Sequence, residues 1–369
     1  MVEKLGRAKY GLPVIVVVLI SCVMALMFYP LIGMSPRELP FAVLSLDQGA
    51  QTELGDVNVG EMLVERLVNA EAPAGADAAP IAWERFASQD DVDRALADNE
   101  LFGALTVPAD FTRLQGLAQA GQGEAPSLSV VIDNAKSPMA AAQLQVLLRT
   151  MFETMDMPAE VQVINAGEPT AGPTSSLAGM MSQQVGVLPL VIMALIGSIL
   201  LTRIFPVAQA GTVRGRFVAL GKQGAYAVGY TFLAGTAATI LLNTLVGAGI
   251  PFWTATVFGW VASLCVLALF LGAFNLGRPV GVLVALYAVL CAMMTATLPR
   301  EMLPTFWADW VYPFTPQHMI ADGVRDILYR GAELMPNGTT GLLAIGGVGL
   351  VLIVVAGLAA KRPGRLAAA

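Results

Sequence analysis

The chain has 369 residues, of which 56% are hydrophobic and only 13% are charged, and its formal net charge is −6. Soluble globular proteins usually carry roughly 25% charged residues, so this composition excludes an ordinary soluble protein. The three cysteines all fall inside apolar runs and therefore suggest no disulfide framework.

Six long apolar runs, separated by polar or charged segments, organise the chain. An uncharged apolar run of about 18 or more residues is typical of a membrane-spanning helix. The runs are Leu12–Met34, Gln184–Thr202, Ala225–Ala248, Trp253–Asn275, Val280–Leu298 and Gly341–Ala360. The sequence therefore predicts an α-helical polytopic membrane protein with six transmembrane helices and a soluble domain inserted between helices 1 and 2.

Residues 1–11 are basic and are predicted to be a cytoplasmic N-terminus, followed by transmembrane helix 1 at residues 12–34. Within this run, Leu19–Cys22 resembles a bacterial lipoprotein cleavage box. Against cleavage, the apolar residues continue well past Cys22, and the run is too long for a signal-peptide core. We therefore predict an uncleaved membrane anchor.

Residues 35–180 are predicted to form an α/β domain on the extracellular side. Short β-rich runs bounded by turn residues predict strands at Phe41–Asp47, Leu101–Pro108 and Leu128–Asn134. Helical periodicity and capping signals predict helices at Val57–Asn69, after Ser88, and at Ser137–Met155.

The densest acidic cluster of this domain comprises Asp90, Asp91 and Asp93. It lies at a predicted helix start, where negative side chains offset the helix dipole. No histidine or cysteine accompanies it within residues 35–180. We interpret the cluster as a solvated helix cap, and we expect no metal site and no cofactor in this chain.

Residues 181–360 are predicted to be a five-helix transmembrane domain, followed by a basic cytoplasmic tail at residues 361–369. It contains a predicted cytoplasmic loop at residues 203–223 and a predicted outer amphipathic segment at residues 299–339. None of the apolar runs has an ionisable side chain near its middle. Proton-driven transporters need such a group as a relay, so a self-powered secondary transporter is disfavoured.

The segment "RGRFVALGKQG" resembles a phosphate-binding loop but departs from it in two ways. Five residues separate Gly215 from Gly221 where the motif has four, and Gln223 follows Lys222 where serine or threonine must hold magnesium. We therefore expect that this chain is not an enzyme and that any ATP is bound by a partner subunit.

The distribution of basic residues predicts the orientation. With both termini in the cytoplasm, the inner segments receive eleven of the 21 Lys and Arg residues but only one of the 27 Asp and Glu residues. Retention of Lys and Arg in short cytoplasmic segments sets the orientation of membrane proteins. The sequence thus predicts a multi-pass protein of a bacterial inner membrane with residues 35–180 extracellular or periplasmic.

The segment Pro313–Gly331 contains the chain's one histidine, His318, and is predicted to lie outside between helices 5 and 6. Apolar residues at helical spacing from Ile320 to Leu328 predict an amphipathic helix. His318 has no nearby cysteine or serine and no metal-ligand spacing, so we interpret the stretch as structural or gating. The residues assigned to this outer gating helix are Pro316, Asp322, Arg325, Asp326 and Arg330, with Asp322–Arg325 and Asp326–Arg330 spaced to pair.

Several segments carry a family resemblance in the same order along the chain. They are "FAVLSLDQGAQTELG", "VDRALADNELFGALTVPADFTRLQ", "SLSVVIDNAKSPMAAAQ", Gly211-Thr212, Gly221-Lys222, and Pro313, Pro316, Arg325 and Tyr329-Arg330-Gly331. Together with the order of helices, they resemble the permease subunits of type-2 ABC exporters, in particular the branch with a large extracellular domain and the related YhgE/Pip (phage infection protein) group. The resemblance implies one helix, an extracellular α/β insert and then five helices.

The resemblance also implies that residues 203–223 contact a separate ATPase subunit. The residues assigned to this ATPase coupling are Gly211, Thr212, Arg214, Arg216, Gly221 and Lys222. Members coupled to an ATPase usually have acidic residues in this loop, and here there are none. The basic residues could instead attract anionic lipid headgroups.

The leading hypothesis is a permease subunit that works as a homo- or heterodimer and exports an amphiphilic or lipid-like substrate, with membrane lipids and an ABC ATPase as partners and no nucleic acid. The alternative is a YhgE/Pip-like surface or scaffold protein, whose extracellular domain binds partners without ATP-driven transport. A membrane-embedded enzyme comes third, because the apolar runs lack polar chemistry.

Overall fold

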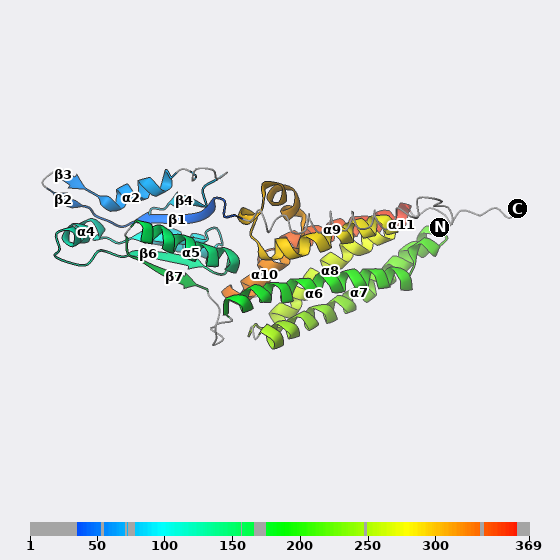
Figure 1. The fold of residues 1–369 in the computed structure, drawn as a ribbon. Helices are drawn as coiled ribbons and strands as arrows, with labels where there is room; N and C mark the ends of the chain where they lie inside the picture. Colours follow the sequence, from blue (N-terminus) through cyan, green and yellow to red (C-terminus); the bar gives the residue numbers. More distant parts are fainter. Residues whose placement is uncertain are drawn as a thin grey trace, which may run out of the picture.

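The computed structural model describes residues 35–52, 55–70, 72, 78–155, 157–165, 175–246, 249–332 and 336–359. These residues form an α/β lobe and a helical bundle, placed end to end (Figure 1). The predicted N-terminus, transmembrane helix 1 and the basic tail at residues 361–369 lie outside the described residues.

A five-stranded sheet in the order β4–β1–β5–β6–β7 forms the centre of the lobe. Its strands are β1 (Leu39–Ser45), β4 (Ile81–Arg85), β5 (Gly103–Val107), β6 (Leu128–Asp133) and β7 (Ala159–Ile164). Neighbouring strands are parallel except for β5 and β6, and β2 (Ala50–Thr52) pairs separately with β3 (Gly55–Val57). Strands β5 and β6 fall within two of the predicted strand segments, and β1 overlaps the third, Phe41–Asp47, but begins two residues before it.

The four helices of the lobe are α2 (Val59–Val68), α3 (Gln89–Ala97), α4 (Phe111–Gln119) and α5 (Pro138–Thr154). Three of them begin at a capping side chain, because Asn58, Ser88 and Ser137 each accept a hydrogen bond from a backbone N–H three residues later. Ser88 caps α3 as predicted, accepting from the Asp91 N–H at 3.2 Å, and its hydroxyl also donates to the Asp91 carboxylate at 2.7 Å. The predicted helix starts are thus explained by local hydrogen bonding.

The bundle contains six described α-helices, and α8 lies at its centre. They are α6 (Ser175–Ile204), α7 (Val213–Leu241), α8 (Phe252–Leu276), α9 (Arg278–Thr297), α10 (Pro316–Arg330) and α11 (Thr339–Ala359). Helix α8 packs against α6, α7, α9 and α11. A short π-helix, η4 (Leu242–Val246), extends α7.

Among the described residues, four helical segments are long and apolar enough to cross a membrane: Gln184–Gln209, Val213–Thr244, Phe252–Leu276 and Thr339–Ala359. They coincide with four of the predicted runs. Helix α9 coincides with the run predicted at Val280–Leu298, and Arg278–Ala288 is its shorter apolar helical part in the described residues. The chain therefore has the apolar helices of a multi-pass membrane protein.

The prediction of a loop at residues 203–223 was wrong for most of its length. Helix α6 ends at Ile204 and α7 already begins at Val213, so only residues 205–212 connect them, with a short 3₁₀ turn, η3 (Val207–Gln209). A continuous apolar run identifies only the part of a helix that lies in hydrocarbon. The basic first turns of α7 lie beyond that part, so hydropathy did not predict that they are helical. The Thr212 side chain caps α7 by accepting a hydrogen bond from the Gly215 N–H at 3.0 Å.

Glycines allow α8 to approach its neighbours at backbone distance. A Cβ atom on Gly349 of α11 would lie 2.5 Å from backbone atoms of Ala268 and Leu269, and one on Gly235 of α7 would lie 2.5 Å from the Trp260 nitrogen. Small residues at helix crossings permit the close packing that drives association inside a membrane.

The segment after α9 joins the lobe to the bundle. Leu298, Met302, Leu303, Trp307 and Val311 are buried in the same apolar cluster as the lobe core. The Arg37 backbone N–H, just before β1, donates to the Glu301 carbonyl at 3.1 Å. The outer segment predicted at residues 299–339 therefore contacts the lobe as well as the bundle.

Candidate functional site

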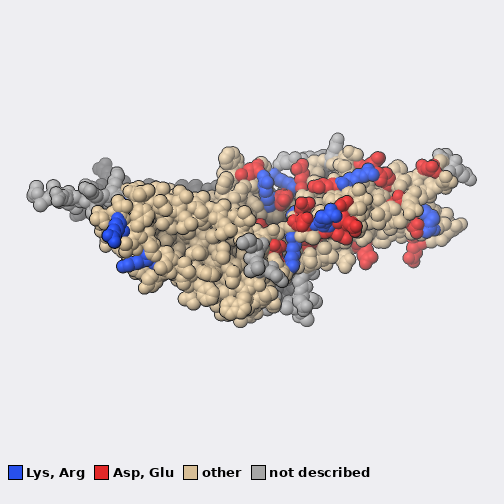
Figure 2. Space-filling model, turned by 180° about the vertical axis from the view of Figure 1, so that it is seen from behind, with Lys and Arg blue, Asp and Glu red and all other residues tan. Residues whose placement is uncertain are grey.

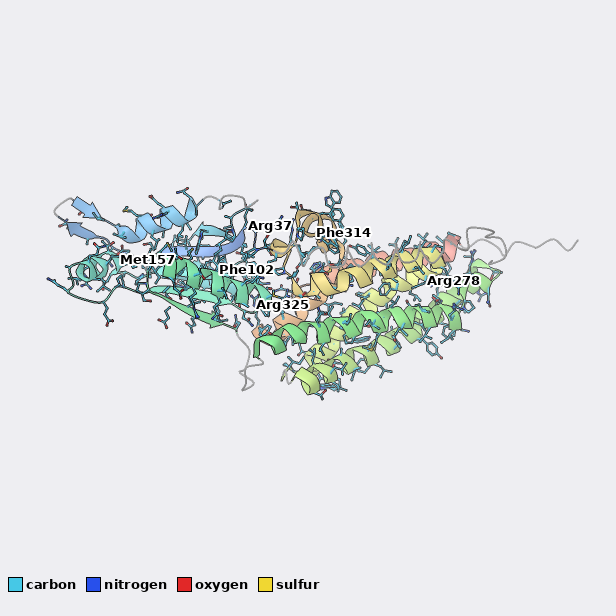
Figure 3. All side chains as sticks on the ribbon, in the orientation of Figure 1. Arg37, Phe102, Met157, Arg278, Phe314 and Arg325 are labelled. Carbon is cyan, nitrogen blue, oxygen red and sulfur yellow. The ribbon has the colours of Figure 1, made fainter. Side chains whose placement is uncertain are left out.

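Two regions contain the site residues predicted from the sequence, and they lie at opposite ends of the bundle. Figure 3 labels Arg325 near the lobe and Arg278 at the other end, which we call the distal end. The distal end comprises residues 203–223 and 275–280, where α6 is followed by α7 and α8 by α9.

The predicted ATPase-coupling residues surround the start of α7 at the distal end. Gly211 and Thr212 close the short connection, and the other four residues belong to the first turns of α7. The side chains of Arg214 and Lys222 are exposed, and Gly221 faces open space. The structure thus places four of these residues in the first turns of one helix instead of in a loop, with Arg214, Gly221 and Lys222 exposed and Arg216 partly buried.

A buried polar network that the sequence analysis missed holds this surface in place. Gln223 is fully buried; its Nε2 donates to the Phe205 carbonyl at 2.8 Å, and the Asn275 Nδ2 donates to its Oε1 at 2.8 Å. These bonds tie the α6–α7 connection to both α7 and α8. Gln223 stands where a phosphate loop needs serine or threonine, and here its side chain has a structural use.

The charge distribution separates the two ends. On the face shown in Figure 2, Lys and Arg at the distal end have no Asp or Glu beside them, a broad uncharged surface follows, and the lobe carries both signs. The basic residues of the distal end are Arg203, Arg214, Arg216, Lys222 and Arg278. The described part of this end, residues 203–223 and 275–280, contains no acidic residue.

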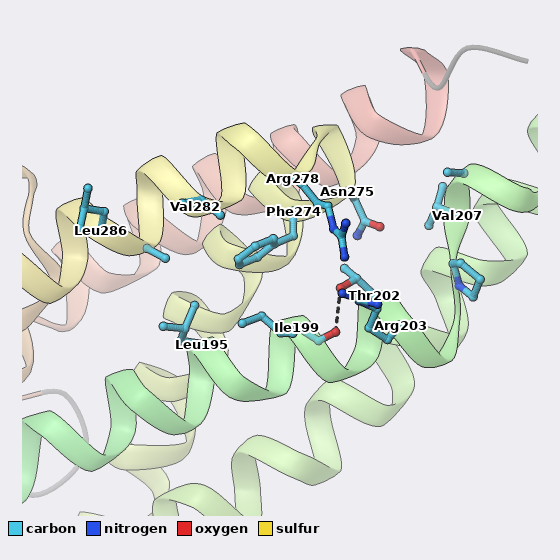
Figure 4. Close-up of a pocket in the computed structure, with 13 residues that line it drawn as sticks. Leu195, Ile199, Thr202, Arg203, Val207, Phe274, Asn275, Arg278, Val282 and Leu286 are labelled. Carbon is cyan, nitrogen blue, oxygen red and sulfur yellow. Dashed lines mark hydrogen bonds between the residues drawn. The ribbon is translucent and has the colours of Figure 1, made fainter. Parts of the chain in front are cut away.

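A groove of about 600 Å³ opens between α6, α8 and α9 at the distal end (Figure 4). Its distal part is lined by Thr202, Arg203, Asn275 and Arg278, and Figure 4 shows the two arginines near each other on facing helices. Its remaining walls are apolar. The groove has the volume of a typical small-molecule site, roughly 300–1,000 Å³.

At the lobe end, α10 covers the bundle as an amphipathic helix. Its apolar residues Ile320, Val324 and Ile327 are buried in the same cluster as α6 and α8. Pro316 occupies the first turn, and Gly331, with a φ of 64°, ends the helix in the left-handed conformation. Helix α10 lies between the lobe and the bundle in Figure 1.

Both ion pairs predicted within α10 are present. Their side chains are largely buried and do not lie on a solvent-exposed face of the helix. Arg325 pairs with Asp322 and is buried. Arg330 lies 3.7 Å from Asp326 and makes a closer ion pair, at 2.9 Å, with Asp133 of β6 in the lobe. No spacing rule could have found Asp133, which is distant in sequence from Arg330.

Asp133 is fully buried, and three groups donate hydrogen bonds to its carboxylate. The Ala135 N–H and the Asn165 Nδ2 donate to Oδ1 at 2.8 and 3.0 Å, and Arg330 donates to Oδ2. The same guanidinium nitrogen of Arg330 lies 2.8 Å from Asn99 Oδ1. We call Asp133, Asn99 and Arg330 the junction cluster; it links the lobe to α10 through a buried charge pair.

His318 packs at the start of α10, at the opposite end of this helix from Arg330. Its ring stacks on Tyr312 with centroids 4.1 Å apart, and its Nδ1 lies 3.0 Å from the Thr315 hydroxyl. Burial is the main cause that lowers the pKa of His318 below its ordinary value. The contacts with Tyr312 and Thr315 give the ring a structural role in this packing.

Comparison with protein families gives a match across nearly the whole chain. A family model described as "ABC-2 family transporter protein" matches residues 12–358. Comparison with curated proteins and with solved structures gives no match.

Proposed function

The chain belongs to the ABC-2 family of transporter proteins, and from this premise we propose that it is the permease subunit of an exporter driven by a separate ATPase. We further propose that it exports an amphiphilic or lipid-like substrate and works as a dimer. The observation that carries the proposal is the exposed, wholly basic surface at the distal end, built from the α6–α7 connection and the first turns of α7.

The structure of this surface supports the proposed ATPase contact. The Gln223–Asn275 network connects residues 205–212 to the central helix α8. A partner that moves this connection would therefore act directly on the middle of the bundle. Within α7 the residues that resemble a phosphate loop form a continuous helix, so nucleotide hydrolysis is assigned to the partner.

The proposed orientation places the distal end in the cytoplasm and the lobe outside. The basic residues of the distal end support it, because Lys and Arg are retained on the cytoplasmic side. An ATPase needs cytoplasmic ATP, so the proposed docking surface and the proposed orientation agree with each other.

A direct test is affinity purification of the full chain from its native membrane, followed by identification of any co-purifying protein with a phosphate loop and an ABC signature. Arg214→Glu combined with Lys222→Glu reverses two exposed charges and is expected to reduce the co-purified ATPase at least about tenfold, equivalent to about 1.4 kcal/mol. Arg216 is left unchanged because its side chain has an interaction within the fold.

The matched control is Arg149→Glu, which makes the same charge change on the exposed surface of α5 in the lobe. It should leave the ATPase bound. If no ATPase accompanies the wild-type chain, and the lobe instead retains an extracellular partner, the YhgE/Pip-like scaffold function replaces the exporter.

A further inference from the structure

The distal groove is amphipathic along its length. Helices α6 and α9 run in opposite directions, so Arg203 and Arg278 both lie at the distal end, whereas Leu195 and Leu286 line the groove nearer the middle of the bundle (Figure 4). The arginine and the leucine are eight positions apart on each helix, which corresponds to about 12 Å at 1.5 Å per residue. The apolar part is therefore long enough for a substantial part of an acyl chain.

The polar end of the groove is positively charged. No acidic residue lines the groove among the residues that the structure describes. Within the described residues, neither the Arg203 nor the Arg278 guanidinium forms a hydrogen bond or an ion pair. Two guanidinium groups without a counter-charge favour a phosphate or carboxylate, which each can bind through paired N–H donors.

The other two polar residues at this end are already bonded to the protein. The Asn275 Nδ2 donates to Gln223 and to the Leu271 carbonyl, and the Thr202 hydroxyl donates to the Ser198 and Ile199 carbonyls. The arginines are thus the donors of the groove that remain for a ligand.

We propose that this groove binds an anionic amphiphile, with its phosphate or carboxylate headgroup between Arg203 and Arg278 and its apolar chain along α6 and α9. Volume, charge and the division into polar and apolar parts all fit this class of ligand. The inference rests on the proposed function, since it specifies the charge and orientation of the exported substrate in the inner leaflet.

Equilibrium binding to the full chain alone tests the inference without any ATPase. The chain is placed in nanodiscs of phosphatidylcholine, and binding of fluorescently labelled phosphatidylglycerol, a labelled single-chain fatty acid and labelled phosphatidylcholine is measured. Anionic ligands are expected to bind at least about tenfold more tightly than the zwitterionic one. Preference for phosphatidylglycerol identifies a phospholipid source, and preference for the fatty acid a single-chain source.

Two variants separate the headgroup from the chain. Arg203→Gln with Arg278→Gln should abolish the preference for anionic ligands, whereas Arg214→Gln, at the same end but outside the groove, should retain it. Ala285→Trp fills the apolar part and should weaken binding of every ligand with both arginines intact.

Unchanged selectivity in the double arginine variant would overturn the inference. So would a disulfide formed between two copies through Val282→Cys, because the groove would then be covered by a second chain. Failure of the ATPase to co-purify would refute the proposed function. It would leave the binding of labelled lipids to the chain in nanodiscs unaffected, so the two failures can be distinguished.

Discussion

Arg330 connects α10 to the lobe through Asp133, and both side chains are largely shielded from water. Removing one member of a buried ion pair leaves an uncompensated charge and costs about 3–5 kcal/mol. Asp133→Asn is therefore expected to lower the free energy of unfolding of the chain in detergent by about 3 kcal/mol. Thermal or denaturant unfolding would measure it.

A double-mutant cycle with Arg330→Gln tests whether the pair itself is responsible. If Asp133→Asn has the same cost with and without Arg330, the two residues do not interact energetically and the junction cluster has no stabilising role. Arg113→Gln is the control, because the Arg113–Asp110 pair is exposed on the lobe and should contribute less than about 1 kcal/mol.

His318 is expected to make the lobe end of the bundle sensitive to acid. Burial lowers its pKa, Asp322 opposes this shift, and Arg325 adds to it. The unfolded chain gains a proton below about pH 6.5 while the folded chain keeps the ring neutral, so stability present above that pH is lost as the pH falls. The loss is at most about 1.4 kcal/mol per pH unit.

Unfolding measured at about pH 7.5 and about pH 5.5 would detect this dependence. His318→Gln removes the ionisable group and should flatten the curve in this range. Because His318 is the chain's one histidine, an unchanged curve would show that burial of this ring does not control the response.

At the scale of elements, the crossing of α8 and α11 depends on Gly349. The three atoms nearest to a Cβ there are backbone atoms of α8, which cannot move aside as a side chain can. Gly349→Ala is expected to push the helices apart and to destabilise the bundle by about 1–3 kcal/mol, as overpacking does in protein cores. The melting temperature in detergent would report the change.

Gly347→Ala provides the matched control, since Gly347 lies on the same helix and faces open space. It should leave the melting temperature nearly unchanged. Because alanine is the better helix former, helix propensity alone would stabilise both variants. Equal losses in the two variants would therefore mean that the α8–α11 contact is not their cause.

Elements were predictable where a local signal exists. Ser88 and Ser137 are recognisable caps, and the central strands β1 and β5 are rich in buried apolar residues. Strands β4 and β7 escaped prediction because they are the sheet edges and carry exposed polar residues, such as Glu84 and Glu160, that weaken the apolar signal. The start of α7 was missed for a similar reason, since hydropathy does not detect its basic first turns.

For the whole molecule, the separation of charge predicts how the chain lies in the membrane. In a cysteine-free background, Gln122→Cys in the lobe and Gln209→Cys at the distal end place thiols at exposed positions. An impermeant maleimide should label Gln122→Cys in intact cells and Gln209→Cys only after permeabilisation. The reverse pattern would invert the proposed orientation and remove the docking surface from the cytoplasm.

Residue order alone was sufficient to identify an apolar helical membrane protein, because solubility in hydrocarbon is a property of each segment by itself. The pairing of Arg330 with Asp133, the burial of Gln223 and the groove between α6 and α9 required the folded arrangement. Periodicity identifies which face of a helix is apolar, but it does not identify the neighbour that this face meets. That choice depends on how the helices and the sheet pack together.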